Sequence, residues 1–244
     1  METLKARCTQ ARMFVTVAEV EARLLAPLLP QPLTPRRLFG TTSGLSLQFL
    51  EVGDSPVGPY FECTLSILCK ETFDWPTIRT KGFRSLLGFP IWIAVTSAAA
   101  ERYGREVWAY PKHVGNLRFA FDARRFEGSA AAAGVTVTCS ADLGVDREPT
   151  DVEFRSLSRR DGDLLCAPMT GRADLTLDWD PSAAFALDLE PLGLGRLEGT
   201  ASTGIYADHF TFELFPPTPR PLSSLAVPVR TSTSELDPRT RRPT

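Results

Sequence analysis

The chain has 244 residues, of which 43% are apolar and 23% charged, as is usual for a globular protein with a substantial core. A net charge of −2 gives no electrostatic reason to expect nucleic acid as a partner. No apolar run approaches the roughly 20 residues of a membrane span, and the N-terminus lacks the apolar centre of an export signal. We therefore expect a cytoplasmic protein without a membrane partner.

The cysteines and histidines argue against disulfide and metal chemistry. The five cysteines contain no Cys-x-x-Cys pair, and their odd number is atypical of a disulfide framework. Two histidines are too few for a His-rich metal centre. We expect neither a metal nor an organic cofactor.

The first periodic segment covers residues 17–29. Its apolar residues recur at helical spacing, with charged residues between them, and prolines follow, so we predict a helix there. From residue 44 the pattern changes to the alternation of β-strands. Residues 89–96 form a nearly continuous apolar run, typical of a strand buried on both faces.

A short helix is expected over residues 97–103, with Ser97 as N-cap and Gly104 as C-cap. Alternation returns at residues 117–121, and further strands are predicted at 133–141, 172–179, 195–203 and 209–215. This pattern predicts a mainly β fold with few short helices, an antiparallel sandwich or barrel. We expect one domain over residues 1–229 and a disordered tail over 230–244.

The segment 104–115 holds Lys112, one of four lysines in a chain that otherwise uses arginine. An apolar frame that includes Trp108, Tyr110 and Pro111 precedes it. Desolvation in such a frame disfavours the ammonium form, and a neutral lysine amine is a nucleophile. Lys112 is either a Schiff-base lysine or a surface lysine at the end of a loop.

Glu62 is the second candidate, in a strand that is otherwise apolar or small. By alternation its side chain shares a face with Tyr60, Thr64, Ser66 and Leu68. That face is either an exposed outer face or the wall of a polar cavity.

The residues Gly104-Arg105-Glu106, followed by Ala109-Tyr110-Pro111-Lys112, resemble the signature of the acetoacetate decarboxylase family. The Pro-x-Pro-Leu turn within residues 29–33 also resembles the family. The resemblance implies a closed or partly closed β-barrel that assembles as a homo-oligomer. It also implies that Lys112 forms an imine with a substrate ketone.

The resemblance further implies roles for other residues. Glu62 matches an active-site glutamate, and Arg12 is the best match to an arginine that holds the substrate carboxylate. Glu71 is the nearest candidate for a second glutamate, without a secure counterpart. Trp108 and Tyr110 are expected to line the substrate site.

His113 departs from the family pattern, which has a second lysine here that helps to expel the proton of the first. A histidine near its ordinary pKa is mostly neutral at pH 7, so this repulsion is weaker. It survives if a carboxylate such as Glu106 keeps His113 protonated. Otherwise burial of Lys112 suffices alone, or His113 itself acts as an acid or base.

Two functions follow from these residues. The first is a lyase that forms a Schiff base between Lys112 and a small keto acid, for decarboxylation or for aldol or dehydration chemistry, in secondary or small-molecule metabolism. The second is a barrel that cyclises or binds a larger apolar, polyketide-like substrate without an imine. Tryptophans such as Trp75, Trp92 and Trp108 would then shape the cavity, and Lys112 would be a hydrogen-bond donor.

Overall fold

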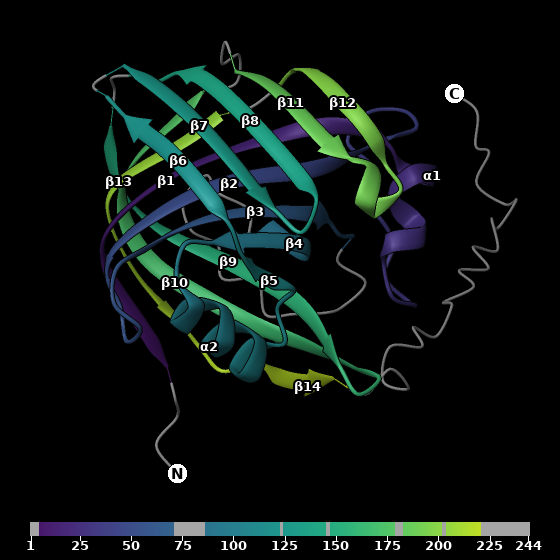
Figure 1. Ribbon diagram of the computed structural model, residues 1–244, viewed down its shortest axis with the longest axis horizontal. Helices are drawn as coiled ribbons and strands as arrows, with labels where there is room; N and C mark the ends of the chain where they lie inside the picture. The colour runs from purple at the N-terminus through teal and green to yellow at the C-terminus, as the bar shows by residue number, and fades with distance from the viewer. Residues whose placement is uncertain are drawn as a thin grey trace, which may run out of the picture.

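The computed structural model describes residues 5–70, 86–122, 124–144, 147–178, 183–201 and 204–220, and shows two β layers (Figure 1). The predicted tail at 230–244 lies outside these residues. The larger layer is built from β1 (Ala6–Glu21), β2 (Thr42–Asp54), β3 (Tyr60–Leu68), β4 (Leu86–Val95), β9 (Glu148–Arg160), β10 (Asp163–Asp178) and β13 (Gly204–Leu214).

These strands form a closed barrel. They follow the order β13-β1-β2-β3-β4-β9-β10, and pairing of β10 with β13 closes the ring. Every neighbouring pair in the ring is antiparallel except β4 and β9, which are parallel. The short strands β5 (Lys112–Val114) and β14 (Thr218–Arg220) add to β4 and β10. The predicted mainly β barrel is therefore confirmed, with one parallel pairing in the ring.

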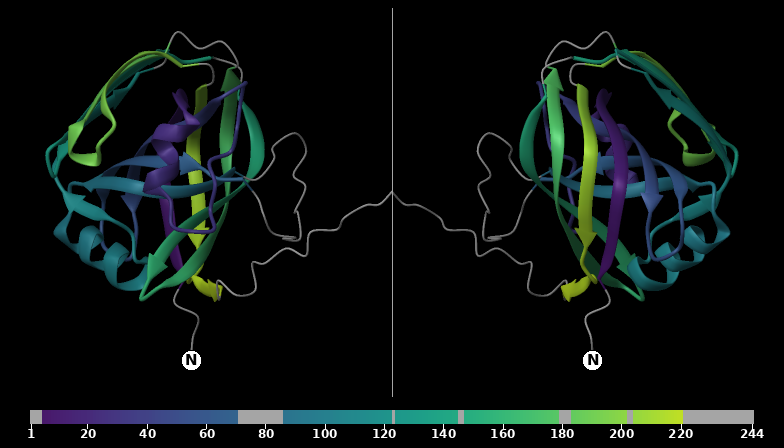
Figure 2. Two further views of the ribbon diagram at one scale, coloured as in Figure 1. Left: turned by 90° about the vertical axis from the view of Figure 1, so that its right-hand side faces the viewer. Right: turned by 90° about the vertical axis from the view of Figure 1, so that its left-hand side faces the viewer.

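The second layer is a five-stranded antiparallel sheet, in the order β12-β11-β8-β7-β6. Figure 2 shows it lying against one side of the barrel. Its strands are β6 (Asn116–Phe121), β7 (Arg125–Ala132), β8 (Val135–Asp142), β11 (Ala184–Leu189) and β12 (Gly195–Thr200). Aromatic side chains fill the space between the layers: the ring of Phe126 stacks on Phe14 at 4.6 Å between centroids and tilts against Phe49 at 4.9 Å.

The helix predicted over residues 17–29 is wrong for most of its length. Strand β1 continues to Glu21, and only the short helices α1 (Ala22–Leu25) and η1 (Ala26–Leu28) follow. Residues 13–18 of β1 are all buried, since one face looks into the barrel and the other packs against the second sheet. A strand buried on both faces loses the alternation that would distinguish it from a helix.

Helix α2 (Ala98–Trp108) connects β4 to β5 at one end of the barrel (Figure 1). The predicted N-cap is confirmed, because the Ser97 hydroxyl accepts a hydrogen bond from the Ala100 amide at 3.3 Å. The predicted C-cap at Gly104 is wrong: the helix runs one turn further and ends at Ala109, which adopts left-handed φ. The second 3-10 helix, η2 (Glu190–Leu192), lies between β11 and β12. In the described ranges, no helix is both long and apolar enough to span a membrane.

Candidate active site

Lys112 begins β5, which pairs in parallel with β4 so that Lys112 lies opposite Ile93. Its ammonium nitrogen Nζ lies 2.6 Å from Oε2 of Glu62, and the two side chains are only 9% and 12% exposed. The other carboxylate oxygen of Glu62 accepts a hydrogen bond from the Thr64 hydroxyl at 3.2 Å. The structure thus brings the two strongest sequence candidates, 50 residues apart, into one buried ion pair.

The order of residues before Lys112 has a direct structural reason. A Cβ atom on Gly104 would lie 2.5 Å from Cδ of Lys112, so any larger residue at this position would force the lysine side chain to shift. Arg105 then holds the backbone of the same lysine, because its Nε donates to the Lys112 carbonyl oxygen at 2.7 Å. Arg105 also pairs with Glu101 rather than with its neighbour Glu106.

Lys112 and Glu62 line a cavity of about 130 Å³ inside the barrel. Residues paired across the strands share a face, and the pairs Leu50–Glu62, Gln48–Thr64 and Ser46–Ser66 form successive rows on the inner face. The predicted grouping of Glu62 with Thr64 and Ser66 is therefore confirmed, and the shared face is the inner one. Apolar side chains such as Phe154, Met169 and Phe212 form the rest of the wall.

Tyrosine and tryptophan side chains surround the lysine. Nζ of Lys112 lies 5.5 Å from the ring centroid of Tyr60. Burial, and then the Glu62 carboxylate, raise the pKa of Tyr60 well above its ordinary value, so this phenol stays protonated. Tyr110 lines the cavity as expected, and burial also raises the pKa of its phenol. Trp108 borders a smaller adjoining space of about 40 Å³ that also touches Lys112.

His113 does not line either cavity, since it follows Lys112 on β5 and its side chain alternates to the other face. Its Nδ1 lies 3.4 Å from the Arg105 guanidinium, not beside Glu106. Partial burial, followed by the charge of Arg105, lowers the pKa of His113 below 6.5, against an opposing effect of Glu101. His113 is therefore mostly neutral at pH 7 and supplies little repulsion to deprotonate Lys112.

Arg12 lies away from the cavity, which is at odds with the expectation that it binds a substrate carboxylate. It pairs with Glu51 at 2.6 Å, and its guanidinium carbon lies 5.0 Å above the ring of Phe121 on the second sheet. Its neighbours Ala11 and Met13 belong to the cluster inside the barrel. The alternation of β1 therefore turns Arg12 outward.

Among the described arginines, Arg155 is the one that borders the cavity. On β9, Arg155 lies between Phe154 and Ser156, which both line the cavity. By strand alternation, the Arg155 side chain therefore points to the opposite face of the strand. There it pairs with Glu153 at 3.1 Å. Arg155 thus borders the cavity with its guanidinium paired to Glu153.

Other sequence candidates fall elsewhere. Glu71 and Trp75 lie outside the described residues. Trp92 is buried in the cluster between the two layers, and its indole nitrogen donates to the Ala132 carbonyl oxygen at 3.1 Å. Sequence reasoning did not single out Ser46 and Gln48. Their polar side chains alternate with apolar ones on β2, a signal that also fits an exposed strand face.

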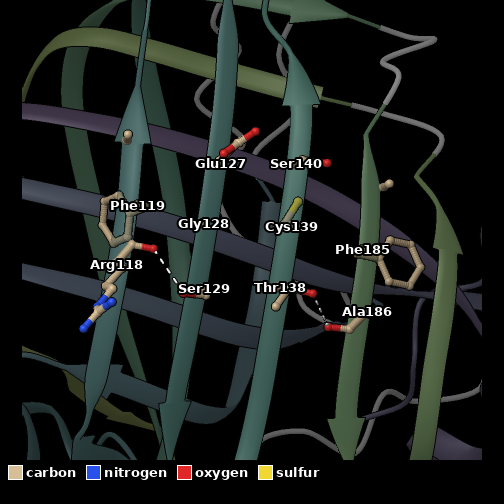
Figure 3. Close-up of a pocket in the computed structure, with 12 residues that line it drawn as sticks. Arg118, Phe119, Glu127, Gly128, Ser129, Thr138, Cys139, Ser140, Phe185 and Ala186 are labelled. Atoms are coloured by element: carbon tan, nitrogen blue, oxygen red, sulfur yellow. Dashed lines mark hydrogen bonds between the residues drawn. The ribbon is translucent and has the colours of Figure 1, made fainter.

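A hollow larger than the lysine cavity lies on the outer surface of the second sheet (Figure 3). It has a volume of about 680 Å³, and small side chains such as Ser129, Thr138 and Ala186 line it. Its thiol, Cys139, is buried and has a pKa raised by burial to about 12, so it is not a nucleophile. The interior cavity is therefore the candidate active site.

The protein is a closed β-barrel with a buried lysine–carboxylate pair in its interior cavity, an arrangement expected of an enzyme. The family model described as acetoacetate decarboxylase matches residues 2–235. The chain therefore belongs to the acetoacetate decarboxylase family, a family of lyases. No curated protein sequence matches it.

Solved structures share the fold. An acetoacetate decarboxylase from Legionella pneumophila superposes with a TM-score of 0.57 at 18% identity, over 90% of this chain and 88% of that one. The enduracididine biosynthesis enzyme MppR, complexed with pyruvate, gives 0.60 at 13% identity, over 90% and 91%. An acetoacetate decarboxylase-like enzyme from Sphingomonas wittichii RW1 gives 0.55 at 14% identity, over 90% and 94%. These low identities support the fold alone.

Proposed function

We propose that this protein is a lyase that forms a Schiff base between Lys112 and a small keto acid. The observation that carries the proposal is the buried contact of 2.6 Å between Nζ of Lys112 and Oε2 of Glu62, on the wall of an interior cavity. Titratable groups that are buried and paired in a cavity are candidates for chemistry. A lysine amine is the nucleophile that forms imines with carbonyl substrates.

Glu62 accepts the proton that Lys112 has to lose before it can act as a nucleophile. The mostly neutral His113 repels the ammonium little, so deprotonation depends on transfer of the proton to the contacting carboxylate. The neutral amine then attacks the ketone carbon. Glu62 returns a proton to the carbinolamine oxygen, the C–O bond breaks, and water leaves to give the iminium.

The iminium is an electron sink for the next step. With a β-keto acid, the electron pair of the bond to the carboxylate carbon moves into the iminium, which releases carbon dioxide and leaves an enamine. With an α-keto acid, loss of a proton beside the iminium gives an enamine that adds to an aldehyde or loses a hydroxyl group. Protonation of the product enamine and hydrolysis of the iminium then regenerate Lys112.

Two observations favour a small keto acid over a larger apolar substrate. The cavity of about 130 Å³ is well below the roughly 300–1,000 Å³ of sites for drug-sized ligands. A structure of the similarly folded MppR is described as complexed with pyruvate. The alternative, a non-imine cyclase or binding barrel for a polyketide-like molecule, predicts no covalent adduct.

Reductive trapping tests the proposal. We expect incubation with acetoacetate or pyruvate and sodium borohydride to add the mass of the reduced substrate to Lys112, as located by peptide mass spectrometry. Lys112→Arg should abolish the adduct. Glu62→Gln should slow its formation by about 10²-fold or more, the usual contribution of a positioned acid–base group, whereas the matched surface variant Glu106→Gln should not. Full activity of Lys112→Arg on the true substrate would refute the proposal.

A further inference from the structure

The inner wall of the cavity carries a polar track that begins beside the lysine. On β2 and β3 the Glu62 row is followed by the pair Gln48–Thr64 and then by the pair Ser46–Ser66. All four side chains line the same cavity as Lys112. The catalytic steps above use none of them, although the Thr64 hydroxyl donates a hydrogen bond to Glu62.

Apart from Thr64, these polar groups lack protein partners in the described part of the chain: Ser46 is buried, whereas Gln48 and Ser66 are partly exposed. Ser46 is 8% exposed, and the side chains of Ser46, Gln48 and Ser66 make no hydrogen bond to any residue that the structure describes. Gly88 faces Ser66, where an added Cβ would lie 3.2 Å from the serine Cβ, so glycine keeps this side of the wall open. Polar groups removed from bulk water are costly unless they find a partner. The track is therefore suited to a polar ligand group.

Strand geometry gives the position of that group. Two residues along a strand span about 6.6–6.8 Å, so the Gln48–Thr64 row lies about 7 Å beyond the Glu62 row, where the reacting amine is held. An extended carbon chain covers this distance in about five bonds. An amide both donates and accepts hydrogen bonds, whereas a second carboxylate would favour an arginine. The described arginine that borders the cavity, Arg155, is already paired with Glu153.

We propose that Gln48 determines substrate specificity by binding a neutral oxygen function, such as a hydroxyl group, about five bonds from the carbonyl carbon that reacts with Lys112. This inference rests on the proposed function of Lys112. It defines the substrate class as hydroxylated keto acids of about six carbons. Ser46 and Ser66 continue the polar wall beyond the reach of such a substrate.

A matched set of probes tests the inference: pyruvate, 2-oxohexanoate and 6-hydroxy-2-oxohexanoate, each titrated in borohydride trapping of Lys112. We expect the half-saturating concentration of the hydroxylated probe to be roughly tenfold lower than that of 2-oxohexanoate, the value of about one hydrogen bond. Gln48→Leu should remove this preference and leave pyruvate unchanged, because pyruvate is too short to reach the amide. Ser66→Ala, on the next row, should keep the preference.

The outcomes separate this inference from the proposed function. Trapping of pyruvate with no preference for the hydroxylated probe, or with a preference that persists in Gln48→Leu, overturns the role of Gln48 alone. If no probe is trapped, the imine proposal fails. Titration calorimetry then compares the affinities of the two six-carbon probes and tests whether Gln48 binds the hydroxyl group. A calorimetric preference that Gln48→Leu removes would support the subsite, and equal affinities would overturn it.

Discussion

Lys112 and Glu62 form a buried pair that stability alone does not explain. Removing two charges from water costs free energy that their mutual attraction repays only in part, and apolar residues of similar volume often stabilise a fold as well or better. The pair nevertheless lies on a cavity wall, with side chains 9% and 12% exposed. Its position supports a chemical role, in which the Glu62 carboxylate that binds the Lys112 ammonium can also accept its proton.

His113 has a consequence for stability at low pH. Its pKa is lowered in the folded protein by partial burial and by Arg105, while in the unfolded chain it titrates near 6.5. The unfolded state therefore binds the proton more readily, and this contribution to stability is present above pH 6.5 and lost as the pH falls through the lowered pKa.

We expect His113→Gln to gain stability relative to the wild type as the pH falls from 7.5 to 5.0, because glutamine does not titrate. The effect should be small, since His113 is partly exposed and solvent screens its charge. Urea unfolding of both proteins at the two pH values measures it. A stability difference that is identical at pH 7.5 and 5.0 would contradict this assignment.

At the scale of elements, α2 and β5 act together to place the lysine. The helix presents Gly104 against the aliphatic part of Lys112, and Arg105 one residue later binds its carbonyl oxygen. The left-handed Ala109 ends the helix, and the parallel pairing of β5 with β4 fixes the direction of Lys112 toward Glu62. The helix, the cap and the short strand therefore form one positioning unit.

Gly104→Ala provides a test with two opposing effects. Alanine improves helix propensity by about 1 kcal/mol, but its Cβ would meet Cδ and Cε of Lys112 at 2.5 and 2.6 Å. We expect the lysine side chain to shift and the rate of borohydride trapping to fall at least tenfold, even if the thermal midpoint does not fall. Glu106→Ala, an exposed substitution in the same helix, should trap like the wild type. Unimpaired trapping by Gly104→Ala would contradict this packing.

At the scale of the molecule, much of the apolar core lies outside the barrel, between it and the second sheet. Phe126 is fully buried there and contacts Phe14 and Phe49, while the barrel interior is partly polar. This division allows the interior to hold an ion pair and open polar side chains. The second sheet thus contributes to function indirectly, by burying the outer face of the strands that carry Glu62 and Gln48.

Phe126→Ala should therefore destabilise the whole protein. Loss of a fully buried phenylalanine costs about 3–5 kcal/mol, and we expect a decrease of that size in the free energy of unfolding from urea titration. Phe39→Ala, at a side chain that is 67% exposed, should change it by less than about 0.5 kcal/mol. Equal effects of the two substitutions would mean that the second sheet is not packed as described.

The sequence alone determined the mainly β fold class, the Lys112 segment and the face shared by Glu62, Thr64 and Ser66. Strand alternation and a local motif carry this information, because both depend on residues that are neighbours along the chain. The same reasoning failed for β1, where burial on both faces produced a helix-like pattern.

Only the tertiary structure decided which face looks into the cavity. Alternation groups the residues of one strand but does not say what lies opposite, and both faces are covered in the barrel strands that pack against the second sheet. Closure of the ring therefore placed Gln48 inside and Arg12 outside. Contacts between residues distant in sequence depend on the register and closure of the strands, and these set Lys112 against Glu62.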